Sequence, residues 1–328
     1  MNPQPRIEPR RPWPVPENGL LAAALLAVVG LMWALNPDQF LTGANLQTLA
    51  FQLPELGLLS LAMMIVLLSG GINLAIIAIS NLAGIVTAWA LLAWVPAAGP
   101  ASIATLATAG ALAIGVAAAW LAGAACGWLV AWLRVTPILA TLGMMLFLEG
   151  FNLVLTQGRA ISGLPITIRF LGNGTVAGVP VPLLVFGVAA LAMSVILNRT
   201  PLGREVYLLG ANPVATWFSG VDNRRVLLWT YIGSGLLAGL AGLIMISRFN
   251  SAKAGYGQSY LLITLLAAVL GGTRATGGFG RVSGLILALL ILQTAASGLN
   301  LLRVNAYYTN ALWGAILLLA MALNRWFR

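Results

Sequence analysis

Neutral amide side chains interrupt several long apolar runs of this sequence. Five of the amides in or beside these runs are Asn73, Asn81, Asn152, Gln293 and Asn300. An amide offers both donors and an acceptor, so such a set could line a path for a small solute rich in hydroxyl groups. Asn and Gln also hydrogen-bond one membrane helix to another, for about 0.6 kcal/mol each. The residue types therefore allow two interpretations, a permeation path and contacts between helices.

Nucleophilic and metal chemistry have few residues available. The sequence contains no histidine, and Cys126 is its only cysteine, set among glycines and alanines. We expect a buried, unreactive Cys126 and no metal site. The only lysine, Lys253, does not belong to a phosphate-binding loop. The sequence thus predicts neither an enzyme nor a chain that binds ATP or another cofactor itself.

Glu149 is the one acidic residue that we place well inside an apolar run. A carboxylate in a membrane is costly unless it is paired or reaches water. It could face a cavity, form a salt bridge to a second subunit, or extend to the outer headgroups. One carboxylate without a neighbouring histidine or lysine gives little support for a proton-coupled carrier.

Composition places the chain in a membrane. Of its 328 residues 60% are hydrophobic and only 7% are charged, whereas soluble proteins carry about 25% charged residues. The apolar runs are continuous and do not alternate with polar residues, which excludes a barrel. We predict an all-α, polytopic helical membrane protein. The net charge of +10 is interpreted as topology signals rather than as a nucleic-acid surface.

About ten transmembrane helices fit the hydropathy pattern. They are expected near residues 19–35, 46–69, 75–94, 102–133, 138–157, 181–198, 226–247, 259–271, 282–302 and 308–324. The fourth is too long for a straight crossing and needs a tilt, a break or a part that lies on the surface. The eighth is short, which indicates a broken or half helix.

Loop charges predict the orientation. With the N-terminus inside, twelve Lys/Arg residues are cytoplasmic and five are outside. Both termini are then cytoplasmic. We expect residues 1–18 to form a disordered cytoplasmic tail and residues 19–328 to form a single transmembrane domain.

A polar segment at residues 199–225 separates two of the apolar runs. It holds four of the seventeen Lys/Arg and two of the seven Asp/Glu. Pro201 and Gly203 are expected to end the sixth span. Asn212 and Pro213 then predict the start of a short helix over residues 213–219, which Gly220 ends. Exposed aromatic residues on this helix would suit either docking of a soluble partner or anchoring in lipid headgroups.

The same segment carries a resemblance to a known family. It reads Gly203-Arg204-x-x-Tyr207-x-x-Gly210-x-Asn212-x-x-Ala215-x-x-x-Ser219-Gly220-Val221. This pattern resembles the cytoplasmic coupling segment of the sugar-type permeases of ABC importers, which carry ribose, xylose, galactosides or autoinducer-2. Three other stretches agree in order: Ser69-Gly70-Gly71-Ile72-Asn73-Leu74, Thr136-Pro137-x-x-Ala140-Thr141-Leu142-Gly143, and Ala267-Ala268-Val269-Leu270-Gly271-Gly272-Thr273 with Gly277-Gly278-x-Gly280. Asn73 stands where the family has aspartate, and Glu149 where it commonly has arginine.

The resemblance implies a permease subunit in the inner membrane of a bacterium. Its partners would be a second permease subunit, identical or not, a cytoplasmic ATPase that binds ATP, and a periplasmic substrate-binding protein. The residues expected to couple the chain to the ATPase are Gly203, Arg204, Gly210, Asn212, Pro213, Ala215, Ser219, Gly220 and Arg274.

The expected solute is a monosaccharide or a similar small polyhydroxylated compound. Autoinducer-2, a nucleoside and an amino acid are the alternatives within the same importer class. The sparse membrane charge argues against an amino acid, which needs partners for its carboxylate and ammonium groups. A standalone secondary carrier is the competing hypothesis from another class.

Overall fold

The computed structural model describes residues 18–95, 100–305, 307–309 and 311–315. Helices dominate, as expected from the continuous apolar runs. The helices are α1 (Asn18–Leu35), α2 (Gly43–Leu68), α3 (Ile76–Trp94), α4 (Ala101–Ala131), α5 (Pro137–Thr156), α6 (Ile166–Asn173), α7 (Val181–Arg199), α8 (Pro201–Ala211), α9 (Pro213–Phe218), α10 (Asn223–Phe249), α11 (Tyr260–Leu270) and α12 (Val282–Leu301). The strands are β1 (Ile161–Ser162), β2 (Thr175–Val176), β3 (Val179–Pro180) and β4 (Ser251–Ala252).

The predicted all-α membrane architecture is confirmed. Eight helices of the described part are long and apolar enough to cross a membrane, and α11 is a shorter apolar helix. The 31-residue α4 is one continuous helix about 46 Å long, so it contains no break. Of the tenth expected span, residues 307–309 and 311–315 are described and helical, and the rest lies outside the described residues, as does the expected tail up to residue 17.

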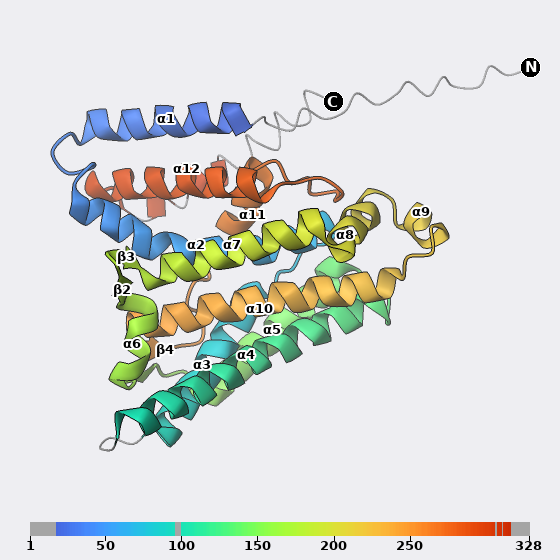
Figure 1. The fold of residues 1–328 in the computed structure, drawn as a ribbon, viewed down its shortest axis with the longest axis horizontal. Coiled ribbons are helices and arrows are strands. Elements are labelled where there is room, and N and C mark those ends of the chain that lie inside the picture. The colour runs from blue at the N-terminus through green and yellow to red at the C-terminus, as the bar shows by residue number, and fades with distance from the viewer. Residues whose placement is uncertain (1–17, 96–99, 306, 310, 316–328) are drawn as a thin grey trace, which may run out of the picture.

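Helix α2 forms the centre of the bundle. Every residue from Leu53 to Leu68 is buried, because α7, α10, α11 and α12 surround it. Figure 1 shows α1 and α12 side by side along one edge and α4 and α5 along the other. Helix α1 packs mainly on α12, and Asn18 Nδ2 donates to Ser283 Oγ at 3.2 Å where both helices begin.

The contact between α4 and α10 depends on glycine. A Cβ atom on Gly123 would lie 2.7 Å from the Tyr231 carbonyl oxygen, and one on Gly235 would lie 2.6 Å from that of Ala119. Small residues let helix backbones approach this closely in membranes. The glycines at 235, 239 and 242 therefore serve packing.

A buried ion pair joins α2 to α10. Arg248 Nη1 lies 3.2 Å from Glu55 Oε1, and the Glu55 side chain is fully buried. The same nitrogen donates to the Phe51 carbonyl oxygen at 3.1 Å. Glu55 lies in the middle of α2, and Arg248 belongs to the last turn of α10.

The two ends of the bundle differ in their connections. At one end β1 pairs antiparallel with β4, β2 pairs antiparallel with β3, and α6 lies beside them. At the opposite end α8 and α9 project from the bundle (Figure 1). Sequence reasoning expected only one helix in the 199–225 segment, but α8 is a second one. Thr200 caps α8 by accepting a hydrogen bond from the Gly203 amide, and Pro201 is its first residue.

The Glu55–Arg248 pair should make a measurable contribution to stability. Glu55→Ala leaves the Arg248 guanidinium without its carboxylate in a largely buried position, so we expect a loss of about 3 kcal/mol in the free energy of unfolding. Reversible unfolding in mixed micelles would measure it. The paired substitution Glu55→Leu/Arg248→Met should recover much of the loss, and a Glu55→Ala variant as stable as the native chain would contradict the assignment.

Candidate functional site

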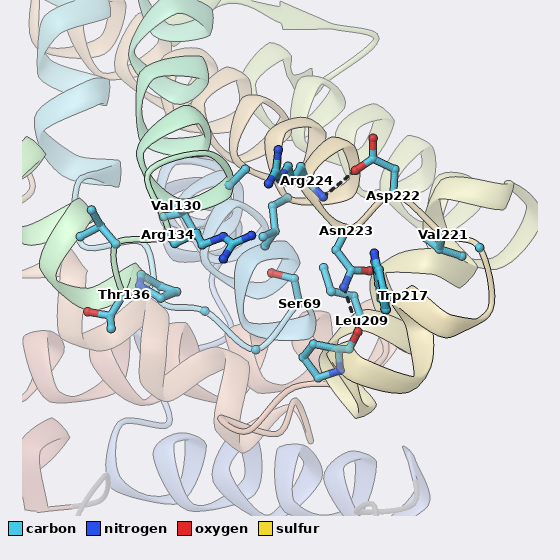
Figure 2. Close-up of a pocket in the computed structure, with 18 residues that line it drawn as sticks. Ser69, Val130, Arg134, Thr136, Leu209, Trp217, Val221, Asp222, Asn223 and Arg224 are labelled. Carbon is cyan, nitrogen blue, oxygen red and sulfur yellow. Dashed lines mark hydrogen bonds between the residues drawn. The ribbon is translucent and has the colours of Figure 1, made fainter.

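A cleft of about 920 Å³ opens at the end of the bundle where α8 and α9 project. Its walls come from the ends of α2 and α4, the starts of α5 and α10, and the α9 segment. Figure 2 shows Ser69, Arg134, Trp217 and Arg224 around it. Stretches far apart in the sequence thus meet at one place.

Helix α9 is built by its own sequence. The Asn212 side-chain oxygen accepts hydrogen bonds from the Val214 and Ala215 amides, both at 3.0 Å. Pro213 is its first residue, where the missing amide hydrogen costs nothing. Gly220 follows the helix with a φ of +83°, a left-handed conformation that glycine adopts without strain. The predicted boundaries are confirmed to within one residue.

One side-chain hydrogen bond joins α9 to the start of α10, which has a cap of its own. Asn223 Nδ2 donates to the Pro213 carbonyl oxygen at 2.8 Å. Asp222 Oδ1 caps α10 by accepting from the Arg224 amide at 3.0 Å. The outer face of α9 carries Trp217 and Phe218, whose rings meet edge to face at 5.0 Å and are 63% and 76% exposed. A fixed short helix therefore presents two large aromatic side chains outward.

A junction of backbones connects this end to the core. Gly278 N donates to the Leu68 carbonyl oxygen at 2.9 Å, and a Cβ atom on Gly210 would overlap that same oxygen. A Cβ atom on Gly277 would lie 2.8 Å from the Gly70 Cα and 2.9 Å from the Gly210 Cα. We call these residues, Leu68, Gly70, Gly210, Gly277 and Gly278, the glycine junction. It joins α8 and the 271–281 loop to the end of α2.

Side chains of α8 and the loop strengthen the junction. Tyr207 Oη donates to the Gly280 carbonyl oxygen at 2.8 Å. Burial raises the pKa of the Tyr207 phenol, against the opposing charge of Arg281, so the hydroxyl keeps the proton that it donates. The Arg274 guanidinium stacks on the Phe279 ring, 4.0 Å from its centroid. The loop is thus a folded unit rather than an open linker.

The cleft has a mainly apolar wall with a few polar groups, and it carries more positive than negative charge. Arg134 and Arg224 line it together with one acidic residue, Asp222, and the hydroxyl residues Ser69 and Thr136. Arg134 has a φ of +56°, so it occupies the left-handed conformation between α4 and α5. Such a cleft can bind an acidic or hydrogen-bonding segment of a protein, but no nucleophile or acid–base pair is assembled among its lining residues.

The structure brings most of the expected coupling residues together at this end. Pro213 and Gly220 line the cleft, and Ser219 Oγ donates to the Ala215 carbonyl oxygen at 2.9 Å. Gly203 packs against the backbone of α7, and Gly210 lies in the glycine junction. Arg204 is exposed on α8. Arg274 is in the loop behind the junction and does not line the cleft.

No hydrogen bond among the described residues joins two of the five amides of the expected solute path. Asn73 Nδ2 donates to Ser234 Oγ at 3.0 Å, Asn152 Nδ2 to the Ala78 carbonyl oxygen at 3.0 Å, and Gln293 Nε2 to Gln52 Oε1 at 2.9 Å. The first bond joins the loop between α2 and α3 to α10, and the other two each join two helices. Asn81 is buried in α3, whereas Asn300 is exposed at the end of α12. Contacts between helices thus account for Asn152 and Gln293, and a contact between a loop and a helix accounts for Asn73.

Sequence reasoning missed Arg134, Ser69 and Thr136 as residues of the cleft. Their positions in the sequence could have indicated this role. Ser69 and Thr136 belong to two stretches that resemble family motifs, one with glycines and one with a proline, and each residue stands at an end of a span. Two span ends on the same side of a membrane can lie side by side. The pairing itself could not be read from the sequence.

Comparisons with known proteins agree with this geometry. Residues 45–321 match the family described as "Branched-chain amino acid transport system / permease component". The chain is 36% identical to the ribose import permease protein of Bacillus subtilis over 92% of this chain and 90% of the relative. It is 32% identical to the D-allose transport system permease protein of Escherichia coli, over 92% and 89%. No solved structure gave a significant match.

The third relative differs in its solute. The chain is 30% identical to an autoinducer 2 import system permease protein of Yersinia enterocolitica, over 92% of this chain and 89% of the relative. All three relatives are matched over nearly their whole length. The likeness therefore includes both ends of the bundle, and with them α8, α9 and the 271–281 loop.

The glycine junction should tolerate no side chain. Gly210→Ala forces a Cβ atom into the backbone of α2, so we expect the free energy of unfolding to fall by about 1–3 kcal/mol despite the higher helix propensity of alanine. Gly187→Ala on α7, where a Cβ atom meets nothing within 4 Å, is the matched control. Thermal unfolding of both variants in detergent measures the effect, and equal midpoints would refute the junction.

Proposed function

Because this chain belongs to the branched-chain amino acid transport system / permease component family, we propose that it is the permease subunit of a bacterial ATP-driven importer that carries a monosaccharide. The observation that supports this most is the full-length likeness to ribose and allose import permeases. The subunit is a multi-pass protein of the inner membrane, and its eight long apolar helices fit that location.

Two observations support a neutral, hydroxylated solute. The relatives named for ribose and allose share about a third of their residues with this chain. The buried ion pair of the described residues is Glu55 with Arg248, and the two charges neutralise each other. An amino acid would require unpaired partners for both of its charges. Autoinducer-2 stays the alternative solute, because a permease for it is also similar to this chain.

The cleft end is the proposed docking surface for a cytoplasmic ATPase. Helix α9 offers two exposed aromatic rings on a short, well-capped helix. Aromatic residues on a rigid support are typical anchors of protein interfaces. The arginines of the cleft, Arg134 and Arg224, would attract acidic residues of the partner. The ATP would be bound by the ATPase, and this chain would bind no cofactor.

The glycine junction supplies a route for the coupling. When α9 moves with the ATPase, α8 moves with it, because Asn212 is both the end of α8 and the cap of α9. Gly210 and Gly278 lie directly on the last turn of α2. A displacement of α8 therefore reaches the central helix without passing through flexible side chains. The coupling residues expected from the sequence fit this route.

The remaining partners belong to the opposite end and to the flank of the bundle. A periplasmic substrate-binding protein would dock on the end with α6 and β1–β4, where Arg159, Arg169 and Lys253 give positive charge. A second permease, of the same or a related sequence, would complete the pore. Glu149, which is half-buried on α5 and forms no ion pair with another described residue, would meet that subunit or water.

Weakening the contact between α9 and the ATPase should uncouple ATP hydrolysis from sugar uptake, while the chain still inserts into the membrane. Replacing Trp217 and Phe218 together by alanine removes the two anchors, so we expect association with the ATPase to weaken by at least about tenfold. Gly220→Val, which strains a φ of +83°, should likewise uncouple ATP hydrolysis from uptake. Co-purification and uptake into ATP-loaded proteoliposomes measure the two effects. The conservative Phe218→Tyr substitution is the control.

Two outcomes would contradict this proposal. If the ATPase still docks, and its ATP hydrolysis is still stimulated, after replacement of the whole 211–221 segment, α9 is not the coupling helix. That result would favour a role of α9 as an anchor in the lipid headgroups. If the purified chain alone moves the sugar across vesicles without an ATPase, the chain is a standalone carrier. Uptake of ¹⁴C-labelled ribose, allose and leucine by the complete importer separates the sugar assignment from an amino acid one.

A further inference from the structure

A second, smaller cavity lies at the end of the bundle opposite α9. It is an open hollow of about 350 Å³, and its seven lining residues are all uncharged: Met245, Phe249, Ser251, Tyr256, Gly257, Ser259 and Tyr260. The volume falls at the small end of the range of ligand pockets. The wall is formed by the last turns of α10, by the segment that follows it, and by the start of α11.

The wall combines aromatic faces with hydroxyl groups. The Phe249 and Tyr256 rings meet edge to face, with centroids 5.3 Å apart. The Tyr256 hydroxyl and Ser251 Oγ lie 2.7 Å from each other. An aromatic face is negative and attracts weakly positive C–H groups, whereas hydroxyl groups exchange hydrogen bonds with other hydroxyls. A sugar ring carries both kinds of group, one on its faces and the other around its edge.

Glycine keeps the cavity open. Gly257 has a φ of +71°, and a Cβ atom on it would lie 3.1 Å from Met245 Cε and 3.3 Å from Tyr260 Cδ2. Any side chain there would extend between Met245 and Tyr260 and reduce the cavity. The left-handed backbone also excludes most other residues without strain. The empty volume is therefore a property of this turn rather than of a chance gap.

The buried ion pair lies beside the aromatic wall. The Arg248 guanidinium that pairs with Glu55 also lies 4.9 Å from the centroid of the Phe249 ring. The Phe249 ring, which is 42% exposed, thus has the paired guanidinium on one side and the Tyr256 ring on another. A preorganised aromatic surface loses little entropy when a ligand binds it.

We propose that this cavity binds a single neutral monosaccharide on the side of the membrane opposite α9. Phe249 covers one apolar face of the sugar ring, and Ser251 and Tyr256 hydrogen-bond its hydroxyl groups. The site would receive the sugar from the binding protein before it enters the pore. This inference rests on the proposed function, because the cavity would have no sugar to receive in a permease of another class.

Saturation-transfer NMR on the full chain in lipid nanodiscs tests the site directly. The probes are D-ribose and D-allose, with leucine as the charged comparison. We expect saturation transfer to the ring protons of the sugars and none to leucine. Phe249→Leu, which keeps apolar volume but removes the ring, should weaken sugar binding by about fivefold. Tyr256→Phe, which removes only a hydroxyl group, should weaken it by a smaller factor.

The matched control is the Phe170→Leu variant, because Phe170 is an exposed aromatic residue of α6 at the same end. This variant should bind the sugars as the native chain does. Equal binding by Phe249→Leu and the native chain would overturn the site. Absence of sugar binding while the complete importer still takes up ribose would overturn the site but not the importer. Uptake of neither sugar by the complete importer would overturn the proposed function, whether or not the cavity binds them.

Discussion

The hydrogen bond to the carbonyl oxygen of Leu68 links the central helix α2 to the end of the bundle that carries α8 and α9. A helix leaves its last carbonyl groups without partners inside the helix, and such groups are costly away from water. At the end of α2 the amides of Ser69, Gly70 and Gly71 close the last turn. The amide of Gly278 satisfies Leu68 from a loop more than two hundred residues further along the chain. The core helix and the α8–α9 end are therefore one hydrogen-bonded unit.

That arrangement is possible only where side chains are absent. Gly210 and Gly277 bring α8 and the loop to within van der Waals contact of the α2 backbone. A contact made by main-chain atoms has no rotamers, so it cannot relax by side-chain rearrangement. Movement at α8 must shift α2 as well. Helix α2 in turn is held to α10 by the ion pair between Glu55 and Arg248, which lies toward the other end of the bundle.

The sequence predicts the parts of this structure whose causes are local. Long apolar runs locate the spans, and the Asn212-Pro213 pair locates α9, because a cap acts on the residues that directly follow it. Helix α8 is missed because Thr200 and Pro201 end one helix and begin the next, and the pattern was interpreted only as an end. The Glu55–Arg248 pair joins positions nearly two hundred residues apart, and no local pattern encodes it. The amides show the same limit: their types suit a solute path, but Asn152 and Gln293 join neighbouring helices, and Asn73 joins the loop between α2 and α3 to α10.

The glycine junction has a consequence for how such a subunit can diversify. Its contacts use backbone atoms of α2, α8 and the 271–281 loop, whereas the outer face of α9 consists of side chains that take no part in them. Residues such as Trp217 and Phe218 can therefore be exchanged without altering the junction that we propose as the coupling route. Substitutions on that face could therefore change which ATPase the subunit would bind. Two importers in one membrane could then each use their own ATPase without exchanging them.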